Sequence, residues 1–184
     1  MRFKPAKHSF LIAALLGFSA ASSFANAVLV SVDATPYDRQ MTPIRPVLTA
    51  GGSAGDRISM LVVNEWMADL RDIPYGYHLV WKTPAEVESR GPADCKGKAV
   101  ALYHRMKANG ATDVRLVIGK RAPTSRITHA WLEWETANGT YMLDPTFNYS
   151  ATRTEKIPKG SYVPHYAYAG AKKFRAATNL VAQN

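Results

Sequence analysis

The hydrophobic period of this chain changes once along its length, and that change constrains the fold more than any other feature. Residues 54–72 and 95–107 carry apolar side chains at the spacing of one helix face. Residues 113–119 alternate apolar and polar side chains, as a strand does, and 127–135 and 141–143 continue as strands. Helices followed by an antiparallel meander of three strands predict an α+β fold rather than alternating strands and helices.

Local cap and turn residues set the ends of these elements. Thr83 and Pro84 suit the start of a further short helix that ends near Glu88. The Asn109-Gly110 pair ends the helix that precedes it, as a C-terminal glycine does. The Asn138-Gly139 pair is typical of a two-residue hairpin turn. A turn at these two residues pairs positions whose numbers sum to 277 across the hairpin.

The N-terminal segment has the pattern of a secretory signal peptide. Arg2, Lys4 and Lys7 are basic, residues 10–18 are apolar, and Ala25-Asn26-Ala27 matches a cleavage site. We therefore expect residues 1–27 to be removed and the protein to be exported, to the periplasm or outside the cell. The alternative is an uncleaved membrane anchor, although the apolar run falls short of the roughly 20 residues of a span.

The chain carries a net positive charge, but this charge does not identify a binding partner. Removal of the signal peptide lowers the formal charge from +9 to +6. Such a charge suits an acidic partner, yet salt screens the attraction beyond about 8 Å. No phosphate-binding loop or nucleic-acid motif is present, so we expect no nucleic-acid partner. No second apolar stretch reaches membrane length, and the oligomeric state stays open.

The remaining chain divides into three parts. Residues 28–53 hold several prolines and a glycine pair and predict an extended leader on the surface. Residues 54–148 contain the predicted helices and strands and form the core. Residues 149–184 are rich in tyrosine, show no clear period, and predict a tail packed on or flanking that core.

The single cysteine, Cys95, lies at the predicted start of a helix. One cysteine excludes an intramolecular disulfide and a cysteine-rich zinc site. Free N–H groups and the helix dipole at such a position favour a thiolate, which is the nucleophilic form. Asp94 before it suits a helix N-cap better than a catalytic acid. An inert thiol in the core is the alternative interpretation.

Two further residues suit a role beside Cys95. His129 lies in one strand of the hairpin and Asp144 at the end of the next, opposite position 133 in the expected register. A histidine can pair with a thiolate and later protonate a leaving amine, and a carboxylate behind it fixes its tautomer. A histidine satisfied within the sheet and an aspartate in a turn are the alternatives.

Four short segments resemble the transglutaminase-like superfamily. Residues 91–99 resemble its G-x-x-D-C-x-G-x-A motif, 128–131 its H-A-W strand, and 141–146 its L-D-P-T segment. Residues 81–86 resemble the W-x-T-P-x-E stretch of bacterial transglutaminase-like cysteine peptidases. The resemblance spans residues 58–148 and implies a papain-like fold, with a nucleophile-bearing helix on a small antiparallel sheet.

The resemblance also implies roles for individual residues. Cys95 would be the nucleophile, His129 the general acid and base, and Asp144 the residue that orients the histidine. Trp81 and Trp131 are candidates for the oxyanion site or the groove, with the backbone N–H of Cys95 as the better oxyanion donor. These roles imply an exported peptidase or amidase acting on peptide or carboxamide bonds of a protein or peptide in the cell envelope, with transamidation as the other outcome.

The residues directly after Cys95 bear on metal binding. Peptidases of the bacterial branch often carry an acidic pair after the cysteine, and some bind calcium there, whereas this chain has Lys96-Gly97. We therefore expect no metal and no cofactor.

The alternative to an enzyme is an inactive binding module of the cell envelope, with Tyr162, Tyr166 and Tyr168 as aromatic anchors.

Overall fold

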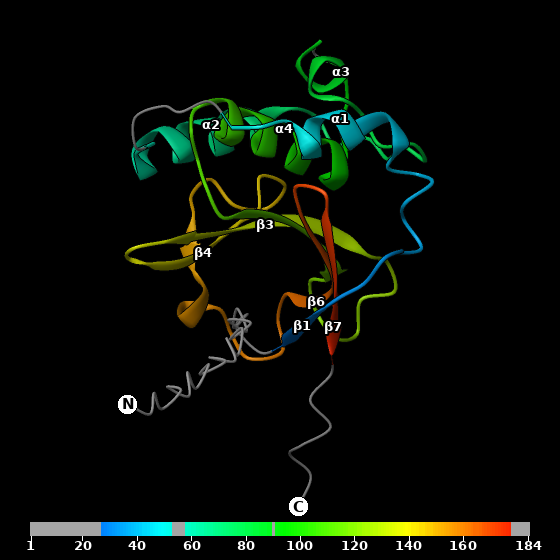
Figure 1. The fold of residues 1–184 in the computed structure, drawn as a ribbon. Coiled ribbons are helices and arrows are strands. Elements are labelled where there is room, and N and C mark those ends of the chain that lie inside the picture. The colour runs from blue at the N-terminus through cyan, green and yellow to red at the C-terminus, as the bar shows by residue number, and fades with distance from the viewer. Residues whose placement is uncertain (1–26, 53–57, 90, 178–184) are drawn as a thin grey trace, which may run out of the picture.

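The computed structural model describes residues 27–52, 58–89 and 91–177 (Figure 1). The predicted signal peptide, apart from Ala27, lies outside the described residues. The α-helices are α1 (Arg45–Thr49), α2 (Met60–Asp72), α3 (Pro84–Glu88) and α4 (Cys95–Ala108), and two short 3-10 helices span Thr42–Ile44 and Thr154–Lys156. The strands are β1 (Val28–Ser31), β2 (Val114–Lys120), β3 (His129–Thr136), β4 (Gly139–Leu143), β5 (Thr152–Arg153), β6 (Val163–Ala169) and β7 (Lys172–Ala177).

The strands form one antiparallel sheet, and the α-helices lie together on one side of it. The strand order is β1-β7-β6-β2-β3-β4-β5. Figure 1 shows the helices as a layer above the curved sheet. Helix α4 packs on β2 and β3 and contacts the three other α-helices, so it is the central helix of the layer. This arrangement confirms the predicted α+β class. No helix of the described residues is both long and apolar enough to cross a membrane.

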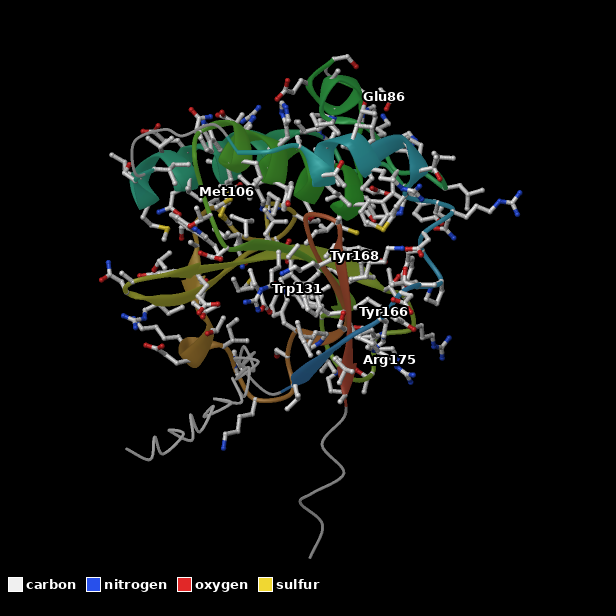
Figure 2. All side chains as sticks on the ribbon, viewed as in Figure 1. Glu86, Met106, Trp131, Tyr166, Tyr168 and Arg175 are labelled. Carbon is white, nitrogen blue, oxygen red and sulfur yellow. The ribbon has the colours of Figure 1, made fainter. Side chains whose placement is uncertain are left out.

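Helix α4 is buried over most of its surface because it lies between the sheet and the other helices. Its side chains, Met106 among them, fill the space between the two layers (Figure 2). Lys98 is buried on this helix, and its ammonium donates to the carbonyl oxygens of Arg71 and Ile73 at 3.1 and 2.6 Å. A cation at the C-terminal end of α2 is favourable because free carbonyl groups and the negative dipole end face it.

The other side of the sheet carries a second, smaller core. Val117, Trp131, Met142 and Ala167 are buried there, and Tyr162 packs against them. The ring centroids of Trp131 and Tyr162 lie 5.3 Å apart in an edge-to-face arrangement. Apolar contacts on both sides therefore fix the central strands that carry the candidate site.

The described part of the predicted tail belongs to the sheet. Strand β6 lies beside β2 in the middle of the order, and β7 pairs with β6. The register of β2 and β6 shifts between Ile118 and Gly119, where Pro164 faces Gly119. A Cβ at Gly119 would lie 2.1 Å from the carbonyl oxygen of Val163, so only glycine fits. Pairing between strands far apart in sequence stabilises this segment, and local periodicity does not reveal such pairing.

The predicted leader is likewise more ordered than an extended segment. Strand β1 pairs with β7 at the edge of the sheet. Helix α1 buries Leu48, and the preceding Ile44 is buried in the main core. The hydroxyl of Tyr103 on α4 donates to the carbonyl oxygen of Leu48 at 3.2 Å. These elements are of four and five residues, too short to show a hydrophobic period.

The hairpin register also differs from the prediction, and the difference matters for the site. Thr136 pairs with Gly139 and Leu132 with Leu143, so the turn occupies residues 137–138 and the paired numbers sum to 275. Gly139 takes up the turn geometry with a φ of +111°. Continuing this register, Asp144 falls opposite Trp131 and not opposite position 133. The shift brings Asp144 two residues closer to His129 along β3.

Candidate active site

Cys95 occupies the first position of α4, where the chain turns into the helix. Asp94 is the N-cap, as predicted, and its Oδ1 accepts a hydrogen bond from the backbone N–H of Gly97 at 3.1 Å. A Cβ at Gly97 would lie 3.1 Å from Val87, so this turn packs closely on α3. Cys95 is 7 % exposed and lines a groove on the surface. The cap and this packing fix the direction of the thiol.

His129 and Asp144 come from the two strands of the hairpin and meet. The Nε2 atom of His129 lies 2.8 Å from Oδ2 of Asp144. Asp144 is fully buried, and its Oδ1 accepts from the backbone N–H of Thr146 at 3.0 Å. Cys95 lies beside the imidazole: both residues line the same groove, and the sulfur helps to raise the pKa of His129. Since Nε2 faces the carboxylate, Nδ1 is the ring nitrogen left for the sulfur.

The charges of this trio follow from burial and from their contacts. Burial lowers the pKa of His129, but hydrogen bonds to Asp144 and Cys95 and their negative charges outweigh burial and raise it to about 9. Burial raises the pKa of Asp144, yet the bond to His129 and further donors leave it below its usual value. At neutral pH the histidine is therefore an imidazolium and the aspartate a carboxylate.

Tyr162 is a fourth member of this cluster that the sequence pattern did not reveal. Its hydroxyl donates to Oδ2 of Asp144 at 2.7 Å, the same oxygen that faces His129. Its backbone has a φ of +51°, and its N–H donates to the carbonyl oxygen of Arg121 at 2.9 Å. From the sequence this tyrosine is only a candidate aromatic anchor of the binding-module alternative, because its segment shows no clear period.

The two predicted tryptophans lie in different places. Trp81 lines the groove beside Cys95, is 1 % exposed, and its Nε1 has no hydrogen-bond partner among the described residues. Trp131 is fully buried and is not among the residues that line this groove. Its indole stacks behind His129, with centroids 6.1 Å apart, and its Nε1 points to Glu133 at 3.5 Å. Figure 2 shows Trp131 on the side of the sheet away from the helices.

The groove has two lobes that meet at Cys95 and His129. The larger lobe has a volume of about 380 Å³ and extends past Trp81, Tyr77 and Leu79. The smaller has a volume of about 290 Å³ and extends toward Phe147. A substrate chain that crosses the groove therefore passes over the thiol, with room on either side of the reacting bond.

A lysine ammonium lies at the start of α4. The ammonium of Lys96 contacts the carboxylate of Asp94 and donates to the carbonyl oxygen of His78 at 2.9 Å. It also lies 4.8 Å from the ring centre of Tyr77. Within residues 27–52, 58–89 and 91–177, no group of three His, Cys, Asp or Glu side chains is placed to hold a metal ion.

A cysteine at the start of a helix, packed on an antiparallel sheet that presents a histidine and an aspartate, defines the transglutaminase-like form of the papain-like fold. No protein-family model matches the chain, and no curated protein matches it. Solved protein structures do match the chain. The chain is similar to calcium-bound LapG from Legionella pneumophila, with a TM-score of 0.55 and 16 % identity over 78 % of this chain and 84 % of LapG.

Two further LapG structures give the same result. EGTA-treated LapG has a TM-score of 0.55 and 16 % identity over 79 % of this chain and 80 % of LapG. A third structure of LapG has the same TM-score and identity over 77 % of this chain and 80 % of LapG. The protein therefore has the fold of transglutaminase-like cysteine proteases, as the sequence resemblance implied.

Proposed function

We propose that this protein is a cysteine hydrolase, a peptidase or amidase, that acts through Cys95, His129 and Asp144. The observation that carries the proposal is the hydrogen bond of His129 to the carboxylate of Asp144, with Cys95 beside the same histidine at the junction of the two groove lobes. A nucleophile with an oriented base beside a groove suits acyl transfer.

In the first half of the reaction, the thiolate of Cys95 attacks the carbonyl carbon of a peptide or carboxamide bond. The imidazolium of His129 faces the thiolate and stabilises it. Negative charge moves to the carbonyl oxygen, where the backbone N–H of Cys95 and the unpaired Nε1–H of Trp81 are the available donors. The imidazolium then protonates the departing amine, the C–N bond breaks, and a thioester remains on Cys95.

In the second half, a water molecule replaces the amine in the groove. The neutral imidazole takes a proton from the water as it attacks the thioester carbon. The C–S bond breaks, the carboxylic acid leaves, and the proton returns the Cys95–His129 pair to its starting state. An amine in place of water would give transamidation. We favour hydrolysis because the fold is that of cysteine proteases.

We also propose that the protein is exported. The basic, apolar and small-residue segments of residues 1–27 support this location. The substrate would then be a protein or peptide of the cell envelope. The N-terminal sequence of the protein purified from its own cells tests this part, and a chain that retains residues 1–27 in the cytoplasm would contradict it.

The activity is tested with a peptide library prepared from a whole proteome, with new N-termini identified by mass spectrometry. We expect the protein to generate new termini and Cys95→Ala to generate none. Cys95→Ala removes one buried sulfur, and an unchanged circular dichroism spectrum would show that the fold persists. Full activity in the folded Cys95→Ala protein would overturn the proposal.

A further inference from the structure

The groove beside Cys95 gathers much of the exposed apolar surface of the described residues. Ten large hydrophobic side chains are exposed in this part of the protein. Five of them line the groove, namely Tyr75, Tyr77, Leu79, Ile127 and Phe147. Tyr77, Leu79 and Ile127 are each more than 70 % exposed. Clustered apolar side chains around a hollow are typical of a binding surface, whereas scattered ones need no explanation.

The charged side chains that line the groove are all basic. Lys96 and Arg126 line the larger lobe and Arg121 lines the smaller. No aspartate or glutamate is among the described residues that line either lobe. The charge of Lys96 is already balanced by Asp94. Neither Arg121 nor Arg126 has a carboxylate within ion-pair distance among the described residues, so both charges are available to a ligand.

Arg121 is positioned before any ligand arrives. Its guanidinium lies 4.1 Å from the ring centre of Phe147, which also lines the smaller lobe. Its carbonyl oxygen accepts the backbone N–H of Tyr162, and Tyr162 in turn bonds Asp144. The guanidinium thus sits over the lobe next to His129. A planar guanidinium held in this way binds a carboxylate through two parallel hydrogen bonds.

We propose that the groove binds an extended peptide segment that places an acidic side chain beside Arg121 and an apolar or aromatic side chain in the larger lobe. This inference rests on the proposed function and names its substrate class. The larger lobe supplies aromatic walls from Tyr75, Tyr77 and Trp81. Arg121 is then a specificity-determining residue, and Arg126 adds to the attraction for an acidic segment.

The cleavage arm of the test compares the native protein with two charge-reversed variants on the proteome-derived peptide library. We expect Asp and Glu to be enriched at a fixed position next to the cut, by about tenfold over neutral residues, as one good charge-assisted contact gives. Arg121→Glu should lose this enrichment and favour Lys and Arg there. Arg175→Glu, an exposed residue of β7 outside the groove, should keep it (Figure 2).

The binding arm needs no catalysis, so it separates failure of this inference from failure of the proposed function. Two pools of random octapeptides, one with a fixed central Glu and one with Gln there, are titrated into Cys95→Ala protein and followed by NMR. We expect the Glu pool to bind more tightly, and Arg121→Glu to reverse the order. Equal binding of the two pools, cuts without acidic neighbours, or an Arg121→Glu protein with unchanged preference would each overturn the inference. Preferential binding without cleavage would support the groove and contradict the hydrolase.

Discussion

The hydroxyl of Tyr162 and the Nε2 atom of His129 both lie on Oδ2 of Asp144, at 2.7 and 2.8 Å. One carboxylate oxygen therefore receives two hydrogen bonds. Burial and the charge of Asp144 raise the pKa of Tyr162, so its hydroxyl keeps its proton and acts as a donor. This contact connects the cluster of Cys95, His129 and Asp144 to the segment before β6.

We expect Tyr162→Phe to lower kcat by about tenfold with little change in KM, since a hydrogen bond to a charged group contributes on the order of 1.5 kcal/mol. The phenylalanine ring keeps the contact with Trp131, so the fold should persist. Steady-state kinetics on a peptide that the library identifies would measure this. Tyr141→Phe, on β4, is the matched control. A Tyr162→Phe protein as active as this control would show that the hydroxyl positions nothing.

We expect the raised pKa of His129 to set the alkaline limit of the proposed activity. The imidazolium persists up to about pH 9 and is lost above it, so protonation of the leaving amine should fail there. The same pKa contributes stability that is fully present below the ordinary histidine value and is lost as the pH rises through about 9. The pH dependence of kcat/KM measures the first effect. An alkaline limit near the ordinary histidine pKa would contradict this assignment.

Asp144→Asn tests the origin of that raised pKa. The asparagine keeps the shape of the side chain but removes the negative charge and replaces one of the two acceptor oxygens by an NH2 donor. We expect kcat/KM to fall by about 10²- to 10⁴-fold, as for other oriented histidines. We also expect the pKa of His129, measured by NMR of its ring protons, to move down toward its ordinary value. An unchanged pKa would mean that Asp144 does not act on His129.

Glu133 gives a prediction about stability rather than activity. It is 6 % exposed on β3, and its Oε2 has no hydrogen-bond partner among the described residues. Burial raises its pKa to about 8, against the opposing effects of Trp131 and Arg115. The protonated form therefore stabilises the fold below the ordinary glutamate pKa, and this contribution is lost as the pH rises through about 8.

At pH 8 or above, we expect Glu133→Gln to raise the free energy of unfolding by roughly 1–3 kcal/mol relative to the native protein. Its melting temperature should therefore be higher. The amide carries no charge to bury and keeps an acceptor for Trp131. At acidic pH the two proteins should unfold alike. Thermal melts across pH measure this, and Glu135→Gln on the same strand, with an exposed side chain, is the control. A Glu133→Gln protein less stable than native at every pH would contradict the account.

The contact between Lys96 and Asp94 predicts the response to chelators. The carboxylate of Asp94 already accepts from the ammonium of Lys96 and from two backbone N–H groups, those of His78 and Gly97. We expect neither EDTA nor added calcium to change the melting temperature or the activity. A melting temperature that falls with EDTA and recovers with calcium would show a metal site that the described residues do not suggest.

The sequence predicts the part of the fold that local signals specify. The predicted helix at 95–107 and the strands at 113–119 and 127–135 lie within one or two residues of α4, β2 and β3. The predicted helix start at Thr83 and Pro84 and the predicted N-cap at Asp94 also match the structure. These features depend on side-chain spacing and on hydrogen bonds within a few residues, which a single sequence displays.

The rest of the fold depends on contacts between distant segments. Strand β6 is stable because β2 and β7 pair with it, and β1 because it adds to β7. The hairpin register depends on which residue takes the positive φ, and Gly139 takes it at the start of β4. Tyr162 could not be found for the same reason: its contact with Asp144 requires the position of β6.

The most direct test of the central claim is the rate at which iodoacetamide alkylates Cys95 across pH in native, His129→Ala and Asp144→Asn proteins. We expect the native protein to be alkylated faster than either variant near neutral pH, because the imidazolium beside Cys95 persists up to about pH 9. Both variants should react slowly near neutral pH. Slow alkylation of the native protein, or rates that His129→Ala leaves unchanged, would contradict a Cys95–His129 pair and favour the inactive binding module.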